Sequence, residues 1–190
     1  MHLDGLKVAV LVTDGYEPSE LTEPIRALRD AGAEPTVVSN HDGQIKGKTD
    51  ADTASVDLTL DAARPEDFDA LLLPGGVKNP DTMRQDERGV AFVRHFADAG
   101  KPIAAICHAP WMLVEADVVR GRRVTSYPSL KTDLRNAGAE WVDEEVVTDR
   151  GLVTSRTPKD LPAFNAKMIE EFGEGTHDAA RSVSTGASVT

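Results

Sequence analysis

The sequence has few of the features that mark secreted, membrane-spanning or nucleic-acid-binding proteins. It contains a single cysteine among 190 residues, so no internal disulfide can form and nothing indicates an oxidising compartment. No apolar run approaches the roughly 18 residues that span a bilayer. Acidic residues outnumber basic ones and give a net charge of −11, which argues against nucleic-acid backbones and anionic membranes as partners.

Composition narrows the class of protein further. Aromatic residues make up only 5% of the chain and hydrophobic residues 40%, so the core must consist mainly of Val, Leu, Ile and Ala. The first residues lack the basic start and apolar stretch of a signal peptide, and we expect a cytoplasmic protein. The acidity is equally compatible with a high-salt cytoplasm. We expect one domain over residues 1–172 and a disordered tail over residues 173–190, which is rich in Gly, Ser, Thr and Ala.

Apolar runs of strand length alternate with helical patterns along the chain. This alternation predicts an α/β protein with a mostly parallel sheet and helices on both of its faces. The predicted strands are at residues 8–12, 36–39, 69–73 and 102–106, with shorter ones at 124–127, 141–142, 146–147 and 152–155. The predicted helices are at residues 19–31, 86–99, 129–137 and 161–172, with another that begins near Pro110, and residues 41–60 are expected to form a hairpin or short antiparallel strands.

Cys107 directly follows one of these predicted strands and precedes the helix near Pro110. Ligands of open α/β sheets bind beyond the carboxyl ends of the strands. Ala105 and Ala109 stand two residues before and after Cys107, as a nucleophile elbow requires, because the turn has no room for large side chains. We expect the start of the helix to lower the pKa of the thiol and to favour the nucleophilic thiolate. A buried, inert cysteine is the alternative.

Two other segments are expected to meet Cys107. Gly75 and Gly76 end the predicted strand 69–73, and their backbone N–H groups, with that of His108, are candidates for an oxyanion hole. Glu20 lies at the start of the predicted helix 19–31. A carboxyl group held near a thiolate has a raised pKa and, when protonated, can donate a hydrogen bond to sulfur. A flexible turn for the glycines and ordinary helix capping for Glu20 are the alternatives.

Together these segments resemble the ThiJ/PfpI superfamily, which includes PfpI-type intracellular peptidases and a parkinsonism-linked stress protein. The resemblance extends over about residues 6–172 and is carried by residues 12–21, 72–76 and 100–110, with weaker matches at 124–128, 136–143 and 154–158. It implies a flavodoxin-like three-layer sandwich with a nucleophile elbow, in which Cys107 is the nucleophile, His108 lies beside it and Glu20 is near the sulfur.

The resemblance also implies an oligomer. In PfpI-type members a neighbouring subunit supplies a carboxylate to the histidine, and this position falls on Asp81, so we expect a homodimer or a hexamer. Two residues depart from the family pattern. Ala109 stands where the family usually has Gly, which tightens the turn. Asp81 is one methylene shorter than the Glu of the peptidases, so it has less reach toward His108.

The resemblance implies two functions, and the thiol itself suggests a third of a different class. The favoured one is a deglycase or glyoxalase that acts on small reactive carbonyl compounds or on glycated proteins and peptides, in general stress protection. The second is a cysteine peptidase that uses Cys107, His108 and Asp81 for acyl transfer. The third is a non-catalytic redox sensor whose thiolate oxidises to sulfinate.

Three other interpretations fail. Class I glutamine amidotransferases share the fold but need a late His-x-Glu, and the only late histidine, His177, is followed by Asp-Ala. Residues 43–49 look like a phosphate-binding loop, but their first glycine is one residue too close to the second for that motif. The segment that follows is also strand-like, where the motif requires a helix. The five histidines and the single cysteine lack zinc-ligand spacing, so we expect no metal and no other cofactor.

Overall fold

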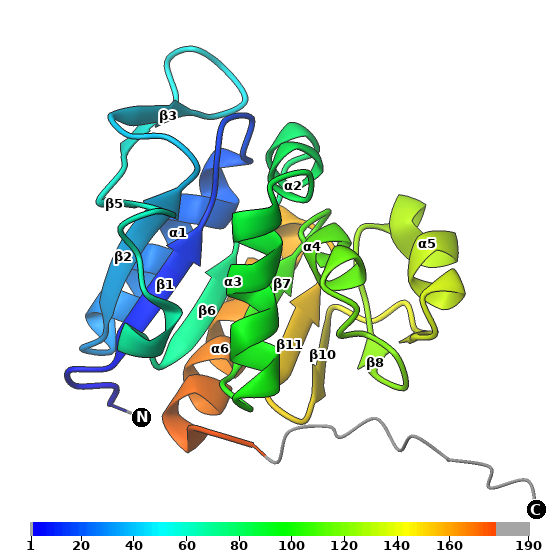
Figure 1. Cartoon of the computed structure of the whole chain (residues 1–190). Helices are drawn as coiled ribbons and strands as arrows, with labels where there is room; N and C mark the ends of the chain where they lie inside the picture. The colour runs from blue at the N-terminus through cyan, green and yellow to red at the C-terminus, as the bar shows by residue number, and fades with distance from the viewer. Residues whose placement is uncertain (1, 178–190) are drawn as a thin grey trace, which may run out of the picture.

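The computed structural model describes residues 2–177 and has a central seven-stranded sheet with helices on both faces (Figure 1). The strand order is β10-β11-β7-β6-β1-β2-β5, and all neighbouring strands are parallel except β10 and β11. The strands of this sheet are β1 (Lys7–Leu11), β2 (Glu34–Ser39), β5 (Leu58–Thr59), β6 (Ala70–Leu73), β7 (Ile103–Ile106), β10 (Val146–Asp149) and β11 (Leu152–Ser155). The predicted mostly parallel α/β sheet is confirmed.

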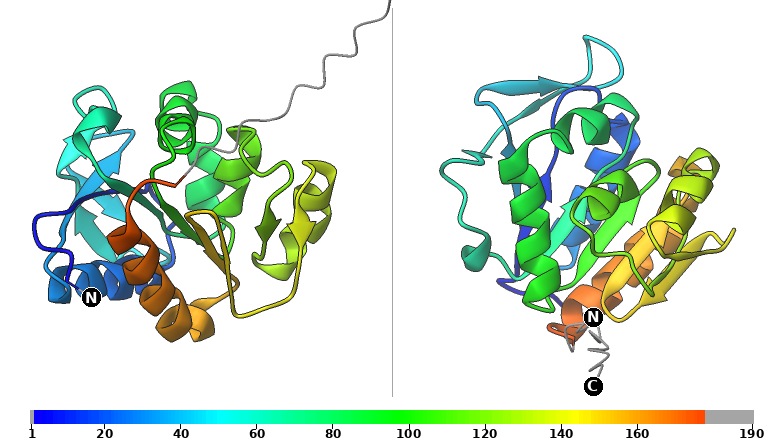
Figure 2. Two further views of the ribbon diagram at one scale, coloured as in Figure 1. Left: turned by 90° about the horizontal axis from the view of Figure 1, so that it is seen from below. Right: turned by 45° about the vertical axis from the view of Figure 1, so that its right-hand side comes forward.

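The central strands are apolar on both faces because helices cover both faces (Figure 2). Helices α1 (Pro18–Asp30) and α6 (Leu161–Glu174) pack on one face, and α3 (Glu87–Asp98) and α4 (Pro110–Glu115) pack on the other. Successive side chains of a strand point to opposite faces, so Leu71 and Leu73 join the core under α3 whereas Leu72 joins the core under α1 and α6. These two cores hold the carboxyl ends of β1, β6 and β7 side by side.

Smaller elements flank the sheet. The predicted hairpin is confirmed as the antiparallel pair β3 (Gln44–Lys46) and β4 (Thr53–Ser55), which stands above the carboxyl edge of the sheet in Figure 1. On the far side, β8 (Arg123–Val124) and β9 (Glu140–Trp141) form a separate parallel pair next to α5 (Lys131–Asn136). Short 3-10 turns lie at Pro65–Asp67, Pro128–Leu130 and Pro158–Asp160. The helix α2 (Lys78–Met83) was not predicted, because its six residues are too few to show a helical period.

The predicted start of the disordered tail is wrong. Helix α6 continues through Gly173 to Glu174, and the backbone N–H of His177 donates a hydrogen bond of 2.8 Å to the carbonyl of Gly100. Residues 178–190, the remainder of that predicted tail, lie outside the described residues. Among residues 2–177, no helix combines the length and the apolar character of a membrane span.

Candidate active site

Cys107 lies at the turn between β7 and α4 in a left-handed backbone conformation, with φ 64°. This conformation costs a non-glycine residue about 1–2 kcal/mol, so the surroundings must hold it. The N–H of Cys107 donates to the carbonyl of Ser155 at 3.0 Å, and the carbonyl of Cys107 accepts from the N–H of Tyr127 at 2.9 Å. The predicted sharp strand-to-helix turn is therefore present, and it places the sulfur at the carboxyl edge of the sheet.

The two glycines after β6 allow three chain segments to meet at the sulfur. A Cβ on Gly75 would lie 2.3 Å from Oε2 of Glu20 and 2.7 Å from Cβ of Cys107. Gly76 has φ +83°, and a Cβ there would lie 2.5 Å from the carbonyl oxygen of Gly15. A larger residue at Gly75 would push Glu20 and Cys107 apart, and one at Gly76 would collide with the backbone of residues 15–17. The site therefore requires glycine at both positions.

Asn79 fixes the glycine turn and was not singled out by the sequence analysis. Its side chain is buried, and its Nδ2 donates to the carbonyls of Pro74 and Gly75, each at 3.0 Å. Its Oδ1 accepts a hydrogen bond of 2.8 Å from the N–H of Thr13. One amide thus ties the end of β1 to the end of β6. In the sequence, Asn79 is only a polar residue shortly after Pro-Gly-Gly, and its burial could not be predicted from that position.

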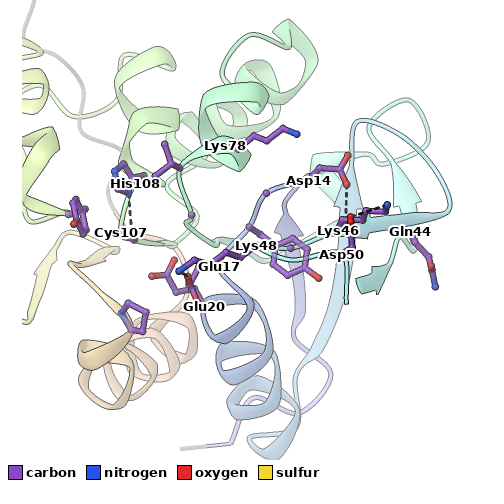
Figure 3. Close-up of a pocket in the computed structure, with 17 residues that line it drawn as sticks. Asp14, Glu17, Glu20, Gln44, Lys46, Lys48, Asp50, Lys78, Cys107 and His108 are labelled. Atoms are coloured by element: carbon purple, nitrogen blue, oxygen red, sulfur yellow. Dashed lines mark hydrogen bonds and ion pairs between the residues drawn. The ribbon is translucent and has the colours of Figure 1, made fainter. Parts of the chain in front are cut away.

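Glu20 is fully buried on the first turn of α1, and its carboxyl group faces the sulfur (Figure 3). Burial raises the pKa of Glu20 to about 8, and the neighbouring charge of Glu17 acts in the same direction. The thiol of Cys107 and the N–H groups of Gly75 and Gly76 lower the pKa of Glu20, but less strongly. Among residues 2–177, no group completes a hydrogen bond of ordinary geometry to either carboxyl oxygen. The predicted rise in the pKa of Glu20 is present, but burial causes it and the sulfur does not, and the carboxyl group is mainly protonated at neutral pH.

The expected lowering of the thiol pKa is wrong. Burial is the largest effect and, with the charge of Glu20, it raises the pKa of Cys107 to about 12. The N–H groups of Gly76 and His108 oppose this rise. The lowered pKa was predicted from the amide groups of the turn alone. The Cys107 side chain is in fact buried and only 7% exposed. Because Glu20 keeps its proton at neutral pH, its charge is absent there and its O–H can donate to a developing thiolate.

The structure separates the three candidate oxyanion donors. The N–H groups of Gly76 and His108 lower the pKa of the thiol, and those of Gly75 and Gly76 lower the pKa of Glu20, so Gly75 is the one of the three that does not act on the sulfur. The first two are therefore placed where negative charge would develop near sulfur. Gly75 serves instead as the point of close approach between Glu20 and Cys107.

His108 lies beside the sulfur and is enclosed by aromatic rings. Its Nδ1 is 3.2 Å from Sγ of Cys107, and its Nε2 is 3.3 Å from Oγ of Ser129. The ring of Tyr127 stacks on it with a centroid distance of 4.5 Å, and Trp111 meets it edge-on at 5.2 Å. Burial lowers the pKa of His108, so the imidazole is neutral at neutral pH and can accept a proton.

The sulfur opens into a cleft of about 810 Å³. Figure 3 shows Cys107, His108 and Glu20 at one end and the β3–β4 hairpin at the other. The hairpin carries Lys46, Lys48 and Asp50 into the wall, and Lys46 pairs with Asp50 at 3.2 Å. A cleft of this volume admits a small carbonyl compound or one modified side chain of a protein.

Asp81 does not join this cleft within the protomer. It is exposed on α2 and lines a separate depression with Arg84 and Glu115. In the same chain, the atom that meets Nε2 of His108 is the hydroxyl of Ser129. Asp81 therefore acts on His108 only if it comes from another subunit.

His177 lies far from the sulfur. Its contacts are with Gly100 and Gly151, which precede β7 and β11 at the amino edge of the sheet. Cys107 is at the carboxyl edge, so this histidine cannot complete an amidotransferase triad. Within residues 2–177, the cluster of potential metal ligands that the structure forms includes His177 and not Cys107.

Comparisons with known proteins agree with this geometry. A model of the DJ-1/PfpI family matches residues 6–171. Protein/nucleic acid deglycase 2 of Escherichia coli is 48% identical over 169 residues, which cover 88% of this chain and 98% of that protein. General stress protein 18 of Bacillus subtilis is 46% identical over 167 residues, which cover 87% and 96% of the two chains.

A solved structure shows the same fold. It is a two-domain protein of Anabaena variabilis with DJ-1/ThiJ/PfpI-like and ferritin-like domains, and it superposes with a TM-score of 0.85 at 37% identity. The match covers 88% of this chain and 48% of that protein, so the chain spans about half its length.

Proposed function

Because the chain belongs to the DJ-1/PfpI family, we propose that it is a cysteine-dependent stress-protection enzyme acting on reactive carbonyl compounds or on glycated adducts. The observation that carries this proposal is the convergence of a thiol, a protonated carboxyl group and two amide donors on one end of an open cleft. The names of the Escherichia coli and Bacillus subtilis relatives, a deglycase and a stress protein, support it.

The first step is addition of sulfur to an aldehyde carbon. The thiol proton of Cys107 passes to Nδ1 of His108, which lies 3.2 Å away and is neutral. Sγ forms a bond to the carbon, and the carbonyl electron pair moves to oxygen between the N–H groups of Gly76 and His108. That oxygen takes the proton of Glu20. The product is a thiohemiacetal, with Glu20 as carboxylate and His108 as imidazolium.

The second step moves hydrogen between adjacent carbons of a 2-oxoaldehyde such as methylglyoxal. The Glu20 carboxylate removes the hydrogen of the carbon bound to sulfur, and the imidazolium of His108 protonates the neighbouring keto oxygen to give an enediol. Return of the Glu20 proton to the second carbon, and of a hydroxyl proton to His108, gives a thioester of lactate. Water then attacks the thioester and gives its proton to Glu20. The departing sulfur takes the proton of His108, which restores the starting state.

On an early adduct of methylglyoxal with an amine, Sγ of Cys107 forms a bond to the carbinol carbon as the bond from that carbon to the amine nitrogen breaks. His108 takes the thiol proton and Glu20 gives its proton to the departing nitrogen, which releases the original side chain. The resulting thiohemiacetal then follows the same hydrogen shift and hydrolysis. Such a modified protein or peptide would contact the charged side of the cleft that the hairpin forms with Lys46, Lys48 and Asp50. This substrate class accounts for a cleft larger than a three-carbon aldehyde requires.

The oligomer remains part of the proposal. Asp81 is exposed on α2, so a second copy in a homodimer or hexamer can bring its carboxylate to Nε2 of His108. The proposal also places the enzyme in the cytoplasm, where reducing conditions keep a lone nucleophilic thiol available.

Two alternatives make different demands on the same groups. A peptidase needs a carboxylate on His108 and so depends entirely on Asp81 of a second subunit. A redox sensor needs the sulfur to be modified by mild peroxide, and mass spectrometry of the treated protein detects that change. The buried acid Glu20 favours the carbonyl reaction, because it has a proton to give to an aldehyde oxygen.

The test is lactate formation from methylglyoxal by the wild type and by the Cys107→Ala, Glu20→Gln and Glu23→Gln variants. Glu23 lies on the same helix but faces solvent, so it is the matched control for Glu20. The proposal predicts loss of activity for the first two variants and wild-type activity for Glu23→Gln. Equal rates for wild type and Cys107→Ala would remove the proposal.

A further inference from the structure

A second cluster of chemically active side chains lies at the end of α6. Figure 1 shows this end of α6 at the edge of the sheet opposite the β3–β4 hairpin. Glu171 and Glu174 are three residues apart on this helix and so share one face. Nε2 of His177 is 3.3 Å from Oε2 of Glu171 and 4.0 Å from Oε2 of Glu174. One potential ligand atom from each of the three residues lies within 4.8 Å of the other two.

His177 is held in this position by the fold. Its backbone N–H donates to the carbonyl of Gly100 at 2.8 Å, just before β7. Its ring lies over Gly151, where a Cβ would be 2.6 Å from Cδ2 of the imidazole. Gly151 thus leaves the space that the ring occupies at the amino edge of the sheet.

The polar atoms of the cluster point at one another, and the contact between His177 and Glu171 satisfies them only in part. The Glu171 side chain is only 8% exposed, and its carboxyl group lies beside the charge of Glu174. Nε2 of His177 is inaccessible to solvent and, within residues 2–177, has no hydrogen bond of acceptable geometry. The amide of Gly151 and the imidazole offset part of the charge of Glu171. A buried carboxylate and an imidazole nitrogen that lie 3.3 Å apart, without a hydrogen bond of acceptable geometry between them, form an arrangement that a cation would complete.

We propose that Glu171, Glu174 and His177 bind a divalent transition-metal ion of the Zn²⁺ type. Ligand atoms at zinc distances in a tetrahedral site lie about 3.3–3.5 Å from one another, and the His177–Glu171 pair already has this separation. The Glu174 side chain is 49% exposed, and a rotation of this side chain would close the remaining gap. A mixed imidazole and carboxylate set suits zinc, whereas Mg²⁺ requires octahedral oxygen ligands. Water supplies the fourth ligand.

The role of this ion is structural. It fastens the segment after α6 to the amino edge of β7 and β11, whereas the nucleophile is at their carboxyl edge. Metal binding therefore raises the thermal stability of the folded chain without supplying any group to the reaction at Cys107.

Calorimetric titration of the full chain with Zn²⁺, in a Cys107→Ser background, tests the site without interference from the thiol. One ion should bind per chain and raise the melting temperature, with no comparable effect of Mg²⁺. The Glu171→Gln and His177→Ala variants should each bind Zn²⁺ at least about tenfold more weakly, since even second-shell substitutions have effects of this size. His95→Ala is the control, because His95 lies on α3 outside the cluster.

Either of two results would overturn the proposal: no zinc binding by the starting protein, or the same affinity in His177→Ala as in His95→Ala. Glu174→Gln provides a further variant whose half-exposed side chain keeps the fold intact, and circular dichroism verifies folding of each variant. The result is independent of the proposed carbonyl activity, which the Cys107→Ser background has already removed.

Discussion

Replacing Glu20 by glutamine should stabilise the protein at neutral pH while it removes activity. The folded chain holds the pKa of Glu20 at about 8, against an ordinary value of 4.5. Below pH 4.5 the acid is protonated in both the folded and unfolded states and contributes no pH dependence. As the pH rises from 4.5 to 8, the unfolded chain releases this proton and the folded chain does not, so the wild type loses stability progressively.

The size of this loss follows from the two pKa values. It is below about 1 kcal/mol at pH 5 and about 3 kcal/mol at pH 7, and it levels off above pH 8 when the folded state ionises as well. Glutamine has nearly the same shape and stays neutral, so Glu20→Gln avoids the loss. The same change removes the acid that protonates the substrate oxygen, and kcat should fall by about 10²–10⁴-fold.

Urea unfolding of the wild type, Glu20→Gln and Glu23→Gln at pH 5 and pH 7 measures the effect. The stability advantage of Glu20→Gln over the wild type should grow between the two pH values. Glu23→Gln makes the same chemical change at a partly exposed carboxylate that pairs with Arg26, and it should show no such growth. An advantage that stays constant or shrinks as the pH rises would show that Glu20 is ionised in the folded protein, and the proposed acid would be absent.

Three other substitutions test how the site is held. Gly75→Ala brings a Cβ within 2.3 Å of Oε2 of Glu20. It should therefore lower the free energy of unfolding by about 1–3 kcal/mol and abolish lactate formation. Wild-type activity in a folded variant would contradict the close approach. Asn79→Ala leaves the buried N–H of Thr13 and the carbonyl of Pro74 without this partner, so it should destabilise the protein by about 1–3 kcal/mol in urea unfolding. An unchanged midpoint would refute this. Asp81→Ala should leave the folding of the protomer unchanged because the side chain is exposed. It should abolish any peptide cleavage by the purified oligomer, and persistent cleavage would exclude Asp81 as the carboxylate of His108.

The sequence predicts the sheet and the position of the nucleophile because both depend on local patterns. Continuous apolar runs such as residues 70–73 and 103–106 occur where helices cover both faces of a strand. The small residues around Cys107 reflect the steric demands of its turn. Gly75, Gly76 and Glu20 meet the sulfur because parallel strands and the helices after them bring their ends to one edge.

The electrostatics of the site could not be predicted because they depend on burial by distant segments. The turn indicated a lowered thiol pKa, but the enclosure of Cys107 raises it to about 12. Ser129 contacts His108 across more than twenty residues of sequence. Asn79 contacts Thr13 across more than sixty residues and so links β1 to β6. Neither contact could be predicted from a local pattern. The cluster at the end of α6 could not be predicted from the spacing of histidines and cysteines, because two of its three residues are glutamates.

The covalent state of Cys107 during turnover tests the central claim most directly. Samples of enzyme turning over methylglyoxal are quenched in acid, and the peptide that contains Cys107 is analysed by mass spectrometry. The mechanism predicts a gain equal to the mass of one methylglyoxal on Cys107, part of it released by hydroxylamine as expected for a thioester. Lactate formation with Cys107 unmodified at every quench time would contradict it.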